Sequence, residues 1–292
     1  MTKITQEMID LVIANNKKCL NYNEGHVLLY KPFSCPSEEI DNYIFKINTL
    51  IQRGISTVKI FDYVKVANLN SKYPKCIILE EKAPGNNIDY KSENISLKSV
   101  NIDFEEISAE YIQGLDDYIN EISLRANSSQ DIYDKLVSDY LTITKSGLSI
   151  DPKPLNFYFD KDKGFTFIDI NDKGNDDVKT YLPRYILGAV LSYGFPYLSI
   201  DYKCTMYIDE ERMNIIKDIL NTIITKVSIS LMPYGYTKEQ VINAASNWIN
   251  QLKYFSKIDD INDLGNILSI DFAHIKEEKE KNIEDGDWSI GW

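Results

Sequence analysis

The chain has 292 residues, of which 43% are hydrophobic and 26% charged, enough apolar material for one large or two modest domains. This composition excludes disordered and collagen-like proteins. The 44 acidic residues outnumber the 32 basic ones, the formal net charge is -12, and no basic block offsets the excess. We therefore expect no nucleic-acid partner.

Several other classes lack the residues that they need. The first 20 residues carry charges throughout and have no uncharged signal-peptide core, and the stretch 185–198 is too short and too rich in Gly and Pro to span a membrane. We expect a cytoplasmic protein without a membrane span, with delivery into another cell left open. The four cysteines form no C-x-x-C pair, and neither His26 nor His274 has a partner at metal-binding spacing. Catalysis would have to use carboxylates, lysines and amides.

The N-terminal third alternates short β-rich runs with two periodic helices. Apolar residues at helical spacing predict helices over 4–16 and 34–54. Runs of β-formers bounded by turn residues predict two hairpins. Their strands cover 19–22, 27–30, 58–66 and 76–79.

Beyond the Pro-Gly punctuation at 82–87, most of the chain reads as helical. Helices are expected over 107–124, 131–145, 210–231 and 238–255, and a hairpin over 156–160 and 165–170. We therefore predict an α+β protein with a small, mostly β N-lobe at 1–84 and a larger helical C-lobe at 85–292.

One loop carries most of the functional information. Asp151-Pro152-Lys153-Pro154-Leu155-Asn156 has the form D-x-K-P-x-N, and the run 165–168 then leads into Asp169. These residues resemble the catalytic loop and the metal-binding aspartate of the protein-kinase superfamily, in a divergent bacterial form similar to the aminoglycoside phosphotransferases. The alternative is a loop whose Asp and Asn merely cap turns.

The resemblance implies a role for each residue of this loop. Asp151 would orient the acceptor hydroxyl or act as its base, and Lys153 would place a cation beside the transferred phosphoryl group. Asn156 and Asp169 would supply oxygen ligands to Mg²⁺ or Mn²⁺. The implied fold is the bilobal kinase-like one, and the implied nucleotide is ATP.

The N-terminal segment supplies the expected nucleotide contacts. Lys31 ends a strand that resembles the kinase V-A-I-K strand and would hold the phosphates, with Glu39 of the following helix as its partner. Backbone groups near Glu81 and Lys82 would meet adenine. Each of these assignments has a simpler alternative. Lys31 would be a solvated lysine at a strand end, and Glu39 an acidic residue favoured by the helix dipole. The segment at 81–82 would be an ordinary strand exit.

The sequence also departs from the family pattern. No G-x-G-x-x-G loop precedes Lys31, Ser149-Ile150 stands where many members have His-Arg, and no A-P-E run follows Asp169. We expect a Mg²⁺-dependent phosphotransferase whose acceptor is a protein Ser/Thr or a small hydroxylated molecule. The alternatives are a pseudokinase that acts as a nucleotide-binding or protein-interaction module, and a kinase-fold enzyme that transfers AMP.

Overall fold

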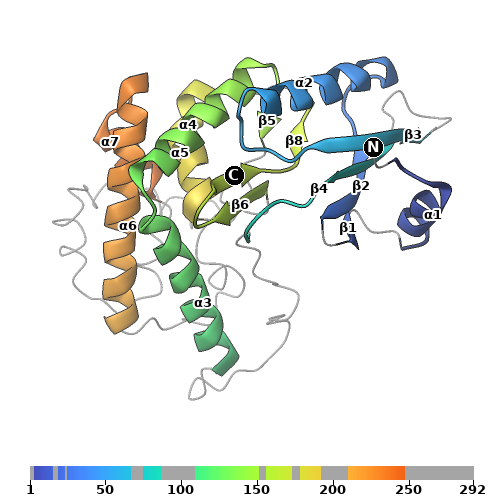
Figure 1. The fold of residues 1–292 in the computed structure, drawn as a ribbon. Coiled ribbons are helices and arrows are strands. Elements are labelled where there is room, and N and C mark those ends of the chain that lie inside the picture. Colours follow the sequence, from blue (N-terminus) through green and yellow to red (C-terminus); the bar gives the residue numbers. More distant parts are fainter. Residues whose placement is uncertain are drawn as a thin grey trace, which may run out of the picture. The chain divides into compact units, whose positions relative to one another are not determined.

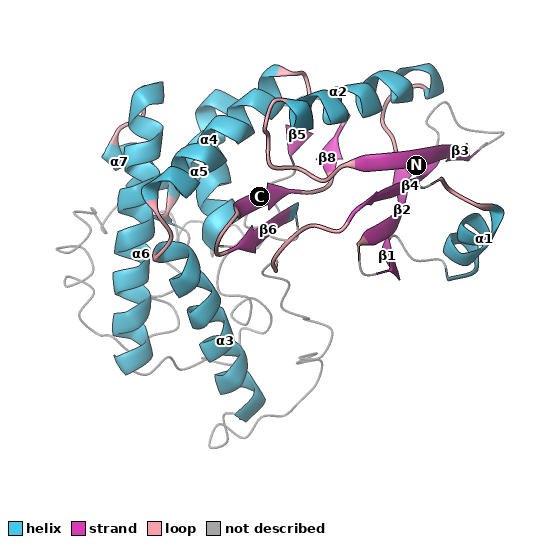
Figure 2. Ribbon diagram, in the orientation of Figure 1, coloured by secondary structure: helices cyan, strands magenta, loops and turns pink. Residues whose placement is uncertain are grey.

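A computed structural model describes residues 3–15, 19–23, 25–66, 75–86, 109–150, 156–172, 178–191 and 210–246. The chain divides into two compact units. Unit 1 comprises Met1–Ile88 and Asp131–Thr180, and unit 2 comprises Asp89–Gln130 and Tyr181–Trp292. The protein has the mixed α+β composition expected from the sequence, with an antiparallel sheet and several helices (Figures 1 and 2). The expected lobe boundary at residue 84 stays a prediction.

The sheet of unit 1 has four antiparallel strands in the order β1-β2-β4-β3. The strands are β1 (Cys19–Asn23), β2 (His26–Pro32), β3 (Ile60–Val66) and β4 (Lys75–Glu81). In the register of the two central strands, Leu29 lies opposite Ile78 and Lys31 lies opposite Cys76. Because successive side chains alternate between faces, Leu29, Lys31, Ile78 and Glu80 share one face of the sheet.

Each face of this sheet is covered by a helix. The amphipathic helix α1 (Gln6–Asn15) packs Met8 and Val12 against Leu28, Ile77 and Leu79 on one face. The helix α2 (Ile40–Gln52) follows a short 3-10 turn, η1 (Ser37–Glu39), and covers the face that carries Lys31 (Figure 1). The sheet therefore holds Lys31 in the interior between itself and α2.

Unit 1 also contains a helix and two small strand pairs. Helix α4 (Gln130–Lys145) precedes β5 (Ser149–Ile150), which pairs with β8 (Ile170–Asn171). Strands β6 (Phe157–Asp160) and β7 (Gly164–Phe167) form the expected hairpin. Ring contacts between α4 and this hairpin make an aromatic core. Its members are Tyr133, Tyr140, Phe157, Phe159, Phe165 and Phe167.

The strand expected over 165–170 is interrupted. Strand β7 ends at Phe167, β8 begins at Ile170, and Asp169 between them has a φ of 49°. A positive φ interrupts the extended backbone, and beyond this residue the chain pairs with β5 instead of β6. Asp169 lies in the bend between two strands, where we expected it at the end of one.

Unit 2 is helical in its described residues. It contains α3 (Ala109–Ala126), most of α5 (Val178–Leu191), α6 (Glu210–Leu231), the 3-10 turn η3 (Met232–Tyr234) and α7 (Lys238–Ala244). The part of the expected 238–255 helix beyond residue 246 lies outside the described residues. Within the described ranges, no helix combines the length and the apolar character needed to cross a membrane.

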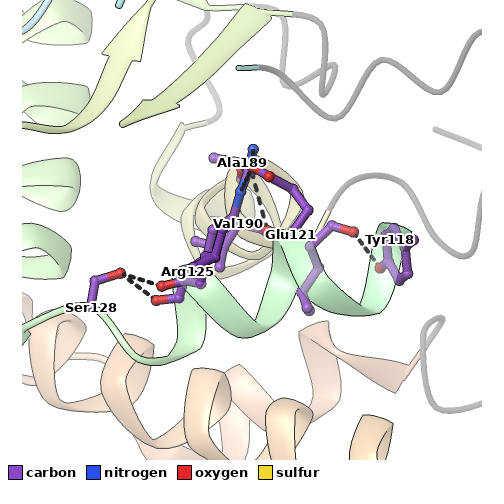
Figure 3. Close-up of polar contacts among 8 residues, drawn as sticks. Tyr118, Glu121, Arg125, Ser128, Ala189 and Val190 are labelled. Carbon is purple, nitrogen blue, oxygen red and sulfur yellow. Dashed lines mark hydrogen bonds and ion pairs between the residues drawn. The ribbon is translucent and has the colours of Figure 1, made fainter. Parts of the chain in front are cut away.

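A buried arginine joins two helices of unit 2. Arg125 of α3 is 1% exposed, and its Nη1 donates to the carbonyl oxygens of Ala189 at 2.9 Å and Val190 at 3.3 Å (Figure 3). The Tyr118 hydroxyl donates to the carbonyl of Leu191 at 2.7 Å. These carbonyls end α5 and have no partner within that helix. Two side chains of α3 therefore cap the C-terminus of α5.

Candidate functional site

Lys31 and Asp169 form a partly buried ion pair in unit 1. The Nζ of Lys31 lies 2.8 Å from Oδ1 of Asp169 and donates to the carbonyl oxygen of Ile170 at 2.5 Å. Lys31 is 8% exposed, whereas the Asp169 side chain is 52% exposed. The fold thus joins two predicted site residues that are 138 positions apart in the chain.

Helix α2 helps to hold the segment that carries Asp169. The hydroxyl of Tyr43 donates to the carbonyl oxygen of Ile170 at 2.7 Å, so this oxygen accepts from both Tyr43 and Lys31. The Lys31 ammonium also lies 5.6 Å from the centre of the Tyr43 ring, within range of a cation–π interaction. The bend at Asp169 is therefore fixed from a strand and from a helix at once.

The surroundings of Lys31 keep it charged. Burial alone would lower its pKa, but Tyr43, Asp169 and Glu80 together outweigh this effect and raise the pKa above its ordinary value. A permanently charged ammonium in a largely buried site is suited to bind an anion. The half-exposed carboxylate of Asp169 is accessible to ligands that carry positive charge.

A second carboxyl group, that of Glu80, lies in the same interior. Glu80 is 8% exposed, and burial raises its pKa to about 8, an effect that the charge of Lys31 opposes and that of Asp169 reinforces. Lys31, Glu80 and Asp169 line one cavity of about 20 Å³, together with Tyr43 and Ile47 of α2. A space of this size holds about one water molecule.

Asn156 lies next to the segment that carries Asp169. Asn156 is buried just before β6, and its main-chain carbonyl accepts a hydrogen bond from the N–H of Ile168 at 2.9 Å. Its amide and the Asp169 carboxylate are both oxygen donors of the kind that Mg²⁺ prefers. Among the described residues, no group of three or more His, Cys, Asp or Glu side chains could hold a metal ion by itself. Mg²⁺ commonly takes one or two protein ligands and completes its shell with water and phosphates, so the chemistry of these two side chains suits that ion. A metal site formed by Asn156 and Asp169 stays a prediction.

The expected partner of Lys31 lies elsewhere. Glu39 is exposed at the end of η1, and the carboxylate that contacts Lys31 is that of Asp169. At the position where α2 faces Lys31, the chain has Tyr43, whose hydroxyl binds the Ile170 carbonyl. The helix of this protein thus approaches Lys31 with a phenol in place of the expected carboxylate.

The residues expected to meet adenine have main-chain N–H groups that already donate within the protein. The N–H of Glu81 donates to the Lys59 carbonyl at 2.8 Å, and that of Lys82 donates to the Gly25 carbonyl at 3.0 Å. A contact between adenine and either N–H would require one of these bonds to open. The adenine contact stays a prediction.

Two predicted site residues, Asp151 and Lys153, lie outside the described residues. Their roles stay predictions.

Glu80 and Tyr43 lie at the site but were not predicted from the sequence. The position of Glu80 could have been predicted. Side chains alternate along the strand Cys76-Ile77-Ile78-Leu79-Glu80, so Glu80 lies on the same face as Ile78, and this run of apolar residues indicates a strand buried on both faces. For Tyr43 the sequence gives no indication of its hydrogen bond to the Ile170 carbonyl, because that contact joins segments 127 positions apart.

Comparison of the chain with models of protein families, with curated proteins and with solved structures finds no match.

Proposed function

We propose that this protein is an ATP- and Mg²⁺-dependent phosphotransferase with a kinase-like, bilobal fold. The observation that carries the proposal is the contact between Lys31 and Asp169 at 2.8 Å. The resemblance assigned these residues to the phosphates and to the metal, two parts of one ligand, and such residues have to lie close together. An arbitrary pair of residues 138 positions apart would have no reason to meet.

The arrangement of unit 1 supports the same proposal. Lys31 lies on a strand that is followed by a helix packed over it, and Asn156 and Asp169 flank a hairpin whose main chain brings residues 156 and 168 together. This is the order in which kinases present the phosphate lysine, the helix and the metal ligands.

The chain's own residues would divide the work as follows. Lys31 binds and orients the phosphates. Asn156 and Asp169 would hold the metal ion, which would supply positive charge beside the transferred group. Asp151 accepts the proton of the acceptor hydroxyl as its oxygen bonds to the γ-phosphorus. The bond from that phosphorus to the bridging oxygen breaks, and ADP leaves. Lys153 stabilises negative charge on the phosphoryl oxygens.

The experiment that tests this function measures transfer of the γ-phosphate and of the α-phosphate of ATP separately. The full-length protein is incubated with a lysate as acceptor pool and with γ-labelled or α-labelled ATP, in Mg²⁺ and in Mn²⁺. We expect transfer of the γ label, and about a 10²- to 10⁴-fold loss of transfer in Asp151→Asn. The matched control is Asp162→Asn, at an exposed residue of the turn between β6 and β7, which should leave transfer unchanged.

The other outcomes identify the alternatives. Transfer of the α label would contradict phosphoryl transfer and favour AMP transfer. Nucleotide binding without transfer of either label would favour a pseudokinase.

A further inference from the structure

Lys31 depends on Asp169 for its neutralisation, yet the proposed function needs Asp169 for a metal ion. In the structure Lys31 has one ion-pair partner among the described residues, Asp169. A buried ammonium that loses its ion-pair partner is strongly destabilised. If Asp169 turns to a metal ion, Lys31 requires another anion nearby.

Glu80 has the properties that such an anion needs. It is as buried as Lys31, it lies on the same face of the sheet, and it lines the same cavity. Within the described part of the chain, no hydrogen bond to its side chain is found, so the carboxyl group is available to a donor. The charge of Lys31 lowers the pKa of Glu80 and that of Asp169 raises it, in keeping with their common position around this cavity.

We infer that Glu80 is a positioning residue that receives the Lys31 ammonium when Asp169 is engaged by metal. Glu80 and Asp169 are then alternative partners of one lysine. This inference rests on the proposed function, because it assigns Asp169 to the metal. It gives Glu80, from strand β4, the task that the resemblance assigned to Glu39.

The exchange makes a prediction that needs neither metal nor activity. Asp169→Asn removes the negative charge next to Lys31, just as a bound metal ion would take that charge away from Lys31. Glu80 is then the remaining carboxyl group of the cavity that can pair with Lys31. Removing Glu80 should therefore matter more in the Asp169→Asn protein than in the wild type. A double-mutant cycle isolates this dependence.

The test measures urea unfolding at pH 9, above the pKa of about 8 of Glu80, for the wild type, Glu80→Gln, Asp169→Asn and the double variant. We expect the double variant to lower the folding equilibrium constant at least 10-fold more than the product of the two single effects. In a Lys31→Met background this synergy should disappear, because no ammonium remains to be shared. Glu81→Gln, at the exposed neighbouring glutamate, should show no coupling to Asp169→Asn.

Additive effects in the wild-type background, or equal synergy with and without Lys31, would overturn the inference. A separate titration of the wild type with Mn²⁺ and ATP distinguishes this failure from failure of the proposed function. Synergy without any nucleotide binding would contradict the function while leaving the shared lysine in place. Nucleotide binding without synergy would contradict the shared lysine and leave the proposed function in place.

Discussion

At the scale of single residues, the interior around Lys31 combines three ionisable side chains in a space with little water. Lys31 and Glu80 are both more than nine-tenths buried, and Asp169, which contacts Lys31, is half-exposed. Charges in such surroundings interact more strongly than at a surface, because the local dielectric constant is lower. The protonation of Glu80 is therefore coupled to folding.

The first prediction concerns Glu80 and pH. The pKa of this carboxyl group is about 8 in the folded chain, against an ordinary value of 4.5. The folded state therefore binds the proton more tightly than the unfolded state, and this contribution to stability is complete below pH 4.5. It is lost as the pH rises through 8.

Glu80→Gln should remove this pH dependence, since glutamine does not ionise. We expect the free energy of unfolding of the wild type to fall, relative to Glu80→Gln, by on the order of 3 kcal/mol between pH 5 and pH 8. Urea unfolding across this range measures the difference, with Glu81→Gln as control. Parallel curves for the wild type and Glu80→Gln would show that Glu80 ionises normally in the fold.

At the scale of secondary-structure elements, close main-chain contacts fix the segments around the site. Gly85 follows β4 with a φ of 78°, and a Cβ atom there would lie 2.0 Å from the carbonyl oxygen of Phe159. The neighbouring Asn86 exchanges two main-chain hydrogen bonds with Phe159, of 3.0 and 2.7 Å. Glycine thus permits the exit of β4 to pair with β6.

The second prediction tests this close approach. Gly85→Ala should destabilise the protein by about 3 kcal/mol or more, because the added methyl group collides with the main chain of Phe159 as well as straining φ. Gly54→Ala is the matched control, since Gly54 has a φ of 81° but no atom within 4 Å of the added Cβ. We expect it to cost only about 1 kcal/mol. Equal losses in urea unfolding would contradict the steric explanation.

The third prediction concerns the cap on α5. Arg125→Met removes the donor for the Ala189 and Val190 carbonyls and should destabilise the protein by about 3 kcal/mol. Arg212→Met breaks a partly exposed ion pair with Asp116, 2.6 Å long, and should cost less than about 1 kcal/mol. Thermal and urea unfolding of both variants measure the two losses of stability. A smaller effect at Arg125 than at Arg212 would show that the cap contributes little.

The elements that the sequence predicts correctly are those with a regular pattern. The helical spacing of Ile40, Ile44, Ile47 and Ile51 predicts α2, and the turn residues at 161–164 predict the β6–β7 hairpin. The break at Asp169 has no such signal in the residue pattern. The hydrogen bonds that hold the next residue, Ile170, come from Lys31 and Tyr43, which are 139 and 127 positions away.

The candidate site, too, has residues that a sequence motif predicts and contacts that depend on the fold. The motif resemblance proposed Lys31 and Asp169 separately, and their contact follows from the fold. The choice of Tyr43 over Glu39 beside Lys31 depends on where α2 begins and how it rotates against the sheet, which residue spacing does not determine to within one turn.

At the scale of the whole molecule, the described residues of the site belong to one of the two units. Lys31, Glu80, Asn156 and Asp169 all lie in unit 1, whereas the capped helix α5 ends in unit 2. A substitution at the cap therefore replaces a residue of unit 2 and none of the described residues proposed to bind nucleotide.

The fourth prediction follows from this division. Arg125→Met should lower the overall stability and keep the affinity for Mg²⁺ and ATP within about twofold of the wild type at a temperature where it is folded. Calorimetric titration at 15 °C, with circular dichroism to verify folding, measures the affinity. A large loss of affinity in the folded variant would show that unit 2 contributes to binding.

The central claim is that Lys31 and Asp169 bind the phosphates and the metal of one nucleotide. Calorimetric titration of the wild type with ATP, in Mg²⁺ and in EDTA, compared with Asp169→Asn, tests it most directly. We predict binding at least about 10-fold tighter in Mg²⁺ for the wild type, and no such Mg²⁺ dependence in Asp169→Asn. Absence of nucleotide binding in both buffers, or the same Mg²⁺ dependence in both proteins, would contradict the claim.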